Sequence, residues 1–119
     1  MLTLPRHVRV FVATEPFNMR GSFDAMAGGV RRLGLEPVDG NLYVFFSRRR
    51  TLAAVLYFDG TGWCTFRKRL EVGTFQLPAA PPGCNRVAVD GRVLAAILEG
   101  LDLRAPRRTW YEPRPLARN

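Results

Sequence analysis

The sequence predicts an α+β fold in a single domain, with a mainly antiparallel meander sheet and two helices packed on it. Length is the first observation, because 119 residues suit one hydrophobic core and are too few for two ordinary domains. The hydrophobic fraction of 47% fits a globular protein. The third observation is a series of short apolar runs separated by turn residues and flanked by helical spacing. We expect the domain to cover residues 1–103.

The first third of the chain predicts a strand followed by a helix. Residues Val8–Ala13 are rich in the β-branched and aromatic side chains that strands favour. Asn18 is expected to cap a helix over Met19–Leu33, which stops at Gly34. The Gly28-Gly29 pair inside it costs about 1 kcal/mol per glycine relative to alanine, and a close packing contact would explain it. The helix presents one apolar stripe, namely Met19, Phe23, Met26, Ala27, Val30 and Leu33.

The middle third predicts a meander. Three turn signals join its apolar runs, at Arg48–Leu52, Asp59–Gly62 and Glu71–Gly73. In the second turn, the Asp59 carboxylate is expected to bond the backbone two residues further on. The predicted strands are Leu42–Ser47, Ala53–Phe58, Trp63–Leu70 and Thr74–Leu77.

Apolar side chains occupy both faces of the first meander strand. Leu42, Val44 and Phe46 point to one face, whereas Tyr43 and Phe45 point to the other. A sheet with one solvated face would alternate apolar and polar residues instead. Something must therefore cover the second face, and a helix, strong curvature or a partner would each do so.

The last third predicts an edge strand, a second helix and a tail. The loop Pro78–Gly83 cannot join a sheet interior, and Arg86–Val89 then suits an edge strand. Asp90 is expected to cap a helix that ends at about Glu99. Residues 104–119 are rich in arginine and proline and are predicted to be disordered when free.

Arginine dominates the charge of the chain. The formal net charge is +8, and Lys68 is the only lysine. Arginine binds phosphate and carboxylate bidentately and stacks on aromatic groups, so the composition favours DNA or an acidic protein as partner. High-GC coding, which inflates arginine without a functional reason, is the alternative explanation.

The sequence offers no pattern for a metal, a cofactor or a membrane. Cys64, Cys84 and the single His7 lack the spacing of a zinc site, so neither a metal nor a cofactor is expected. The amino terminus has no apolar signal segment, and no run approaches the roughly 18 apolar residues of a membrane span. We therefore expect a cytoplasmic protein without a membrane partner.

The arginines of the first hairpin are the strongest candidates for nucleic-acid binding. Arg48, Arg49 and Arg50 lie at the hairpin tip, where each could neutralise one DNA phosphate. The alternative is a solvated turn whose charges keep a sheet edge from aggregating.

Arg67, Lys68 and Arg69 are the second candidate group. They alternate across a strand, so Arg67 and Arg69 share a face with Trp63 and Thr65 that could stack bases. Equally, their aliphatic stems could cover apolar surface.

Arg20 and Asp24 are the third candidate group, at the start of the first predicted helix. A helix amino terminus attracts an anion, but we favour an ordinary i,i+4 ion pair between the two side chains. A hydrolase would need carboxylates brought together, and nothing in the spacing assembles Asp24, Asp59, Glu71, Glu99 and Asp102.

Ordered motifs along residues 1–104 resemble a known family. Arg9–Thr14 followed by Asn18–Asp24 resembles the opening of the small TnpB accessory proteins. These proteins are the products of the second open reading frame in the insertion-sequence family numbered sixty-six. The resemblance continues in the same order through Leu42–Phe45, Arg48–Arg50, Leu56–Gly62, Lys68–Phe75 and Leu98–Asp102.

The resemblance implies a non-enzymatic accessory protein of a bacterial insertion sequence, encoded beside a DDE-type transposase and assisting DNA transposition. Its implied partners are DNA, the transposase and the other accessory protein of the element. Contact with DNA through a basic surface is the first hypothesis. The second is an adaptor that docks on the transposase or another accessory subunit without touching DNA.

The chain departs from the family pattern beside its strongest basic cluster. Leu52-Ala53-Ala54 stands where the family usually has Arg-Leu-Lys, so two cations are missing there. Phe58 replaces the usual tryptophan, which is a milder change.

Overall fold

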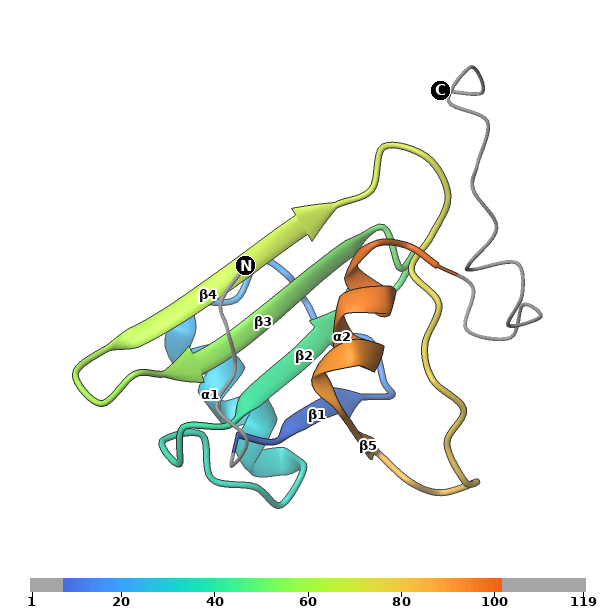
Figure 1. Cartoon of the computed structure of the whole chain (residues 1–119). Helices are drawn as coiled ribbons and strands as arrows, with labels where there is room; N and C mark the ends of the chain where they lie inside the picture. Colours follow the sequence, from blue (N-terminus) through green and yellow to red (C-terminus); the bar gives the residue numbers. More distant parts are fainter. Residues whose placement is uncertain (1–7, 102–119) are drawn as a thin grey trace.

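A computed structural model describes residues 8–101 of the chain. This part combines one sheet with helices and confirms the α+β class (Figure 1). In chain order the elements are β1 (Val10–Ala13), α1 (Phe23–Arg32), β2 (Leu42–Phe46), β3 (Leu52–Phe58), β4 (Trp63–Arg69), β5 (Arg86–Val89) and α2 (Gly91–Leu98).

The sheet is mixed, with five strands in the order β4-β3-β2-β1-β5. β2, β3 and β4 are antiparallel neighbours, as predicted, and β5 pairs antiparallel with β1. β1 and β2, however, run parallel, so the meander is confined to β2–β4. The parallel pair follows from α1, because a crossover helix returns the chain to the starting end of the sheet before the next strand begins.

A helix lies on each face of the sheet (Figure 1). Tyr43 and Phe45 of β2 pack in the cluster that contains the apolar face of α1. Val44 and Phe46 pack in the opposite cluster, with the apolar face of α2. Helices therefore cover both apolar faces of β2, one of the three solutions that the sequence left open.

Helix α1 begins at Phe23 and not at Met19 as predicted. Its N-cap is Ser22, whose Oγ accepts a hydrogen bond from the main-chain N–H three residues on, at 3.2 Å. Asn18 closes a separate turn, since its Oδ1 accepts from the N–H of Arg20 at 2.9 Å. Such a local side-chain bond offers the backbone an alternative to the helix.

Of the glycine pair inside α1, Gly29 makes a close packing contact, whereas a Cβ atom at Gly28 would meet only Arg32 at 3.8 Å. A Cβ atom at Gly29 would lie 3.0 Å from a ring carbon of Phe17 and 3.4 Å from one of Phe45. The two rings contact each other, with centroids 4.8 Å apart. The close packing contact that the sequence suggested is present at this glycine.

Residues 74–77 do not form the predicted strand. The segment between β4 and β5 must pass from one edge of the sheet to the other, and its apolar residues fill the core from a loop. Phe75 is fully buried on the α2 side, where its ring centroid lies 5.6 Å from that of Phe46.

The last two elements follow the prediction. β5 is an edge strand beside β1, and Oδ1 of Asp90 caps α2 by accepting from the N–H of Val93 at 2.9 Å. No helix within residues 8–101 is long and apolar enough to cross a bilayer. The predicted tail, residues 104–119, lies outside the described residues.

Candidate nucleic-acid interface

The predicted nucleic-acid-binding residues gather at one end of the sheet. Strand pairing sets Leu52, which follows the β2–β3 turn, opposite Arg69 at the end of β4. The side chain of Arg67 reaches the carbonyl of Met19, so the segment before α1 lies at this end too. We call it the arginine end, and it contains Arg20, Arg48, Arg49, Arg50, Arg67, Lys68 and Arg69.

Arg48, Arg49 and Arg50 form the turn between β2 and β3. The Arg50 N–H donates to the carbonyl of Ser47 at 2.9 Å, and the Ser47 N–H donates to the carbonyl of Leu52 at 3.0 Å. The three arginine side chains are exposed, and within residues 8–101 they form no hydrogen bond or ion pair. Three like charges therefore stand side by side without an acidic neighbour to neutralise them.

Arg50 adopts a left-handed backbone conformation, with φ 60°, which costs a residue with a Cβ roughly 1–2 kcal/mol. Its carbonyl accepts a hydrogen bond from the N–H of Phe75 at 2.7 Å, and the Thr51 carbonyl accepts from the N–H of Leu70 at 2.9 Å. Main-chain bonds thus hold the turn and leave its side chains available. The chain carries an arginine where glycine would be more stable.

Arg67 and Lys68 bind other parts of the fold. Nη1 of Arg67 donates to the carbonyl of Met19 at 2.7 Å, and Nη2 lies 3.7 Å from Sδ of Met26. On the opposite face of β4, Nζ of Lys68 donates to the carbonyl of Leu98 at 2.7 Å. This carbonyl belongs to the C-terminal end of α2, where a positive charge is favourable. Both side chains therefore connect β4 to a neighbouring element.

The alanines that depart from the family pattern are core residues of β3. Ala53 and Ala54 are buried, and Ala54 pairs with Arg67 across the β3–β4 ladder. A longer side chain at Ala54 would compete with Arg67 for the same face of the sheet. Arg67 is accordingly the cation that occupies this face.

The expected Arg20–Asp24 ion pair is not formed. Because α1 begins at Phe23, Arg20 lies in the turn before the helix, and i,i+4 spacing does not bring the two side chains together. Asp24 occupies the first turn of α1, where its carboxylate is favourable and disfavours a bound anion. The ion pairs of residues 8–101 are Arg31–Glu36, at 4.0 Å, and Arg69–Glu71, at 3.7 Å.

A hollow of about 420 Å³ lies beside the arginine turn. The turn forms one side, and the segment 16–19 between β1 and α1 supplies the other, with apolar side chains. Sequence reasoning missed this segment, because its approach to the turn is a tertiary contact that no local spacing records. The lining residues are Pro16, Phe17, Asn18, Met19, Ser47, Arg48, Arg49, Thr51 and Leu52.

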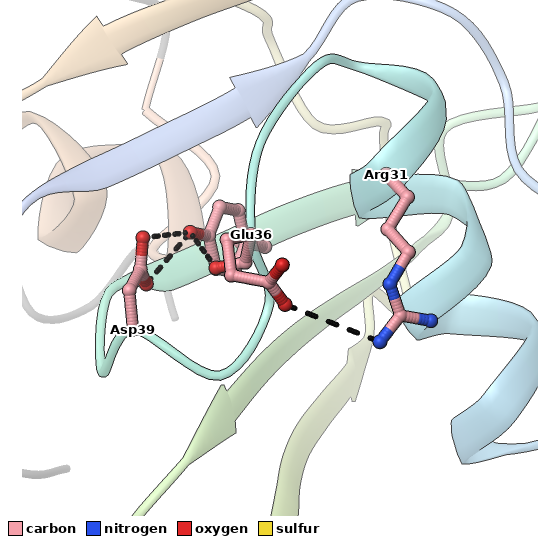
Figure 2. Close-up of polar contacts among 4 residues, drawn as sticks. Arg31, Glu36 and Asp39 are labelled. Atoms are coloured by element: carbon pink, nitrogen blue, oxygen red, sulfur yellow. Dashed lines mark hydrogen bonds and ion pairs between the residues drawn. The ribbon is translucent and has the colours of Figure 1, made fainter.

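The opposite end of the sheet carries acidic side chains from the segment before β2, from the β3–β4 turn and from the N-cap of α2. There the buried Tyr43 hydroxyl lies within 2.9 Å of both Asp39 carboxylate oxygens and of the Glu36 carbonyl (Figure 2). Burial raises the pKa of Tyr43 well above its usual value, and the hydrogen bond to Asp39 raises it further. We call this the acidic end, and its acids are Glu36, Asp39, Asp59 and Asp90.

Asp59 closes the β3–β4 turn as predicted. Its Oδ1 accepts hydrogen bonds from the N–H groups of Thr61 at 2.9 Å and Gly62 at 2.8 Å. These bonds lower the pKa of the Asp59 carboxyl. Cys64 is half-buried, with Sγ 3.7 Å from the other carboxylate oxygen. In the described part of the chain, no three His, Cys, Asp or Glu side chains gather as metal ligands would.

Comparison with known proteins confirms the resemblance seen in the sequence. The family model described as "IS66 Orf2 like protein" matches residues 8–108. The "Uncharacterized protein y4hO" of Sinorhizobium fredii is 41% identical over 111 residues, which cover 92% of this chain and 95% of that protein. The "Uncharacterized protein y4jC" of the same species is 28% identical over 119 residues, or 98% of this chain and 100% of that protein. No solved structure matches. The chain belongs to the IS66 Orf2-like (TnpB) family of insertion-sequence accessory proteins.

Proposed function

We propose that this accessory protein assists transposition by holding DNA through its phosphate backbone at the arginine end. The β2–β3 turn carries the proposal, because Arg48, Arg49 and Arg50 are exposed, free of partners within residues 8–101 and fixed by main-chain bonds. Guanidinium groups bind phosphate bidentately. Backbone contact carries no sequence information by itself, so the protein would hold element ends or target DNA while the DDE-type transposase performs the chemistry.

The other predicted cations contribute less to this contact. Arg67 and Lys68 already donate to the carbonyls of Met19 and Leu98, and turning them toward DNA would break those bonds. Arg69 shares its charge with Glu71. DNA binding therefore depends mainly on the β2–β3 turn. The hollow beside the turn would accommodate part of the DNA backbone that the arginines hold.

A titration of duplex DNA by fluorescence anisotropy at several salt concentrations tests the proposal. Each neutralised phosphate contributes about −0.9 to the slope of log K against log salt, so three arginines supply about −2.7. The triple variant Arg48→Ala, Arg49→Ala, Arg50→Gly should lose this part of the slope. Its affinity should fall by about two orders of magnitude or more at 0.1 M salt.

The matched control removes the same charge elsewhere, with Arg9→Ala, Arg31→Ala and Arg92→Ala. These positions are exposed, and Arg31 faces Glu36 of the acidic end. This variant should bind DNA within a few-fold of the wild type. Absence of binding at low salt, binding without salt dependence, or an equal loss in both triple variants would contradict the proposal.

The adaptor hypothesis has less support from the fold than DNA contact. It required an exposed apolar face of the sheet, and within residues 8–101 the clusters that include α1 and α2 cover both faces of β2 and leave β4 partly exposed. Co-purification with the transposase tests it, because apolar docking should survive salt above physiological strength. Retention at high salt by the triple-arginine variant would favour the adaptor over DNA contact.

A further inference from the structure

The outer edge of β4 presents unpaired main-chain groups. β4 is the terminal strand of the sheet (Figure 1). The Asp59 N–H donates to the Gly62 carbonyl at 3.1 Å, and the Leu70 N–H donates to the Thr51 carbonyl at 2.9 Å. The pairs Asp59–Gly62 and Thr51–Leu70 continue the β3–β4 register at its two ends. Along an antiparallel ladder, hydrogen-bonded pairs alternate with pairs that are not hydrogen-bonded, so every second residue of β4 bonds to β3. The residues whose N–H and C=O groups face outward are therefore Trp63, Thr65, Arg67 and Arg69.

An edge of this kind is a template for another strand. Among the main-chain hydrogen bonds of turns and loops within residues 8–101, none involves these outward groups. Phe66, at the middle of the strand, exposes 38% of its surface. The cations of β4 would normally discourage pairing, but their charged groups are directed to Met19, Leu98 and Glu71.

We propose that the β4 edge pairs antiparallel with the β4 edge of a second copy of the chain, with Phe66 on the twofold axis. In this register, every outward-facing residue meets an outward-facing residue of the other copy. Trp63 pairs with the partner's Arg69, and Thr65 with the partner's Arg67. Phe66 meets the partner's Phe66, so the exposed rings of the two copies bury each other.

The pattern of charges selects this register. No cation stands directly opposite a cation, and Arg69 meets the indole of Trp63, a favourable cation–π arrangement. A shift that placed Arg67 on the axis would set like charges directly opposite each other, which is destabilising. A shift that placed Thr65 on the axis would carry Arg69 past the end of the facing strand.

An acidic extended peptide is the other occupant that a cationic edge accepts. The second copy is favoured because Arg67, Lys68 and Arg69 already have partners within the chain. The exposed ring of Phe66, by contrast, needs an apolar cover, which the partner's Phe66 supplies and an acidic peptide does not. The pairing joins two five-stranded sheets into one and does not involve the Arg48–Arg50 turn. It uses Arg67 and Arg69 of the arginine end but not the turn, so the loss of DNA binding expected for the turn variants and the loss of dimer expected for the β4 variants can be told apart.

Sedimentation velocity of the full chain over the micromolar range tests the proposal. Wild type should form a concentration-dependent dimer. Phe66→Lys places like charges on the axis, and Thr65→Pro removes an outward N–H without breaking the ladder to β3. Each should raise the dimer dissociation constant about tenfold or more, since that factor needs only about 1.4 kcal/mol. Phe66→Leu keeps an apolar group on the axis and should preserve the dimer, and circular dichroism checks that each variant is folded.

Cysteine crosslinking tests the register. With Cys64→Ser and Cys84→Ser as background, Phe66→Cys should form a disulfide dimer, because residues on the axis lie within bridging distance. The matched control keeps Cys64 as the single cysteine; it faces the partner's Lys68 and should not crosslink. A monomer at all concentrations, a dimer indifferent to Phe66→Lys and Thr65→Pro, or faster crosslinking through Cys64 would overturn the proposal. A monomer that binds an acidic peptide would overturn it in favour of that partner.

Discussion

The β2–β3 turn at the arginine end and the β3–β4 turn at the acidic end join strands of the same meander in different ways. In the β3–β4 turn, Asp59 accepts two main-chain hydrogen bonds, and Gly60 takes the positive φ of 103°. In the β2–β3 turn, a positive φ of 60° falls on Arg50. Its arginine side chains bond to nothing else within residues 8–101. One turn stabilises itself with its own side chain, whereas the other presents its side chains to the solvent.

The two ends of the sheet therefore have different roles: side chains at the acidic end stabilise the fold, and side chains at the arginine end are available for binding. At the acidic end, Asp39 accepts hydrogen bonds from Tyr43 and Asn41, and Asn41 accepts from the N–H of Arg9 in turn. These side chains connect the segment before β1 to β2. At the arginine end the bonds that hold the turn come from the main chain and from Ser47. Arginine side chains can therefore be exchanged there without unfolding the protein, which makes the comparison testable.

The largest stability effect is expected from Asp39→Ala at the acidic end. The change removes the carboxylate from the buried Tyr43 hydroxyl, which keeps the Glu36 carbonyl as an acceptor. We expect a loss of about 1–2 kcal/mol in the free energy of unfolding, measured by urea denaturation. The control is Glu71→Ala at the arginine end, whose exposed pair with Arg69 should be worth less than about 0.5 kcal/mol. Equal losses in the two variants would remove the distinction between the ends.

Tyr43 should also make the acidic end sensitive to high pH. Its pKa is raised in the folded protein, so the fold favours the neutral phenol. This contribution is complete below the unfolded pKa of about 10 and is lost as pH rises from there to the folded pKa, because in that interval only the unfolded chain releases the proton. Urea midpoints measured on either side of pH 10 should fall more for wild type than for Tyr43→Phe. An equal decline would show that the hydroxyl does not titrate in this way.

Local patterns in the sequence predicted most of the fold, because they record local physics. The Asp59 turn, the Asp90 cap and the edge strand at 86–89 are present where turn and cap chemistry placed them. The parallel β1–β2 pair was missed, because strand direction depends on the crossover helix between the two strands. The segment 74–77 has strand-like residues, yet it forms a loop, because burial of Phe75 in the core replaces a ladder.

The candidate site was predictable in composition but not in arrangement. The positions of Arg48–Arg50 at a hairpin tip and of Arg67 and Arg69 on one strand face follow from alternation alone. The bonds that Arg67 and Lys68 make to Met19 and Leu98 could not be inferred, since each joins residues far apart in the sequence. The same holds for segment 16–19 beside the arginine turn.

A smaller gain in stability is expected from Arg50→Gly. Glycine takes a left-handed conformation without the Cβ cost, so the variant should be more stable than wild type by about 1 kcal/mol. Arg50→Ala is the matched control, because it removes the same charge and keeps the Cβ atom. It should therefore gain nothing from relief of strain. A loss of stability in Arg50→Gly relative to Arg50→Ala would show that the turn carries no backbone strain, and the contrast with Gly60 would then disappear.

The smallest effect is expected from Asp59→Asn in the β3–β4 turn. The main-chain bonds from Thr61 and Gly62 lower the pKa of Asp59 in the fold, so the charged carboxylate stabilises the folded protein. That contribution is present above the unfolded pKa of about 3.9 and is lost as pH falls toward the lower, folded pKa. Asparagine keeps an acceptor oxygen but not the charge, so the variant should be slightly less stable at neutral pH, and its difference from wild type should shrink below about pH 4. Urea midpoints of the two proteins across this range measure that difference. If it stays constant or grows on acidification, the Asp59 charge does not stabilise the turn. The acidic end would then owe its stability to the Tyr43–Asp39 contact alone.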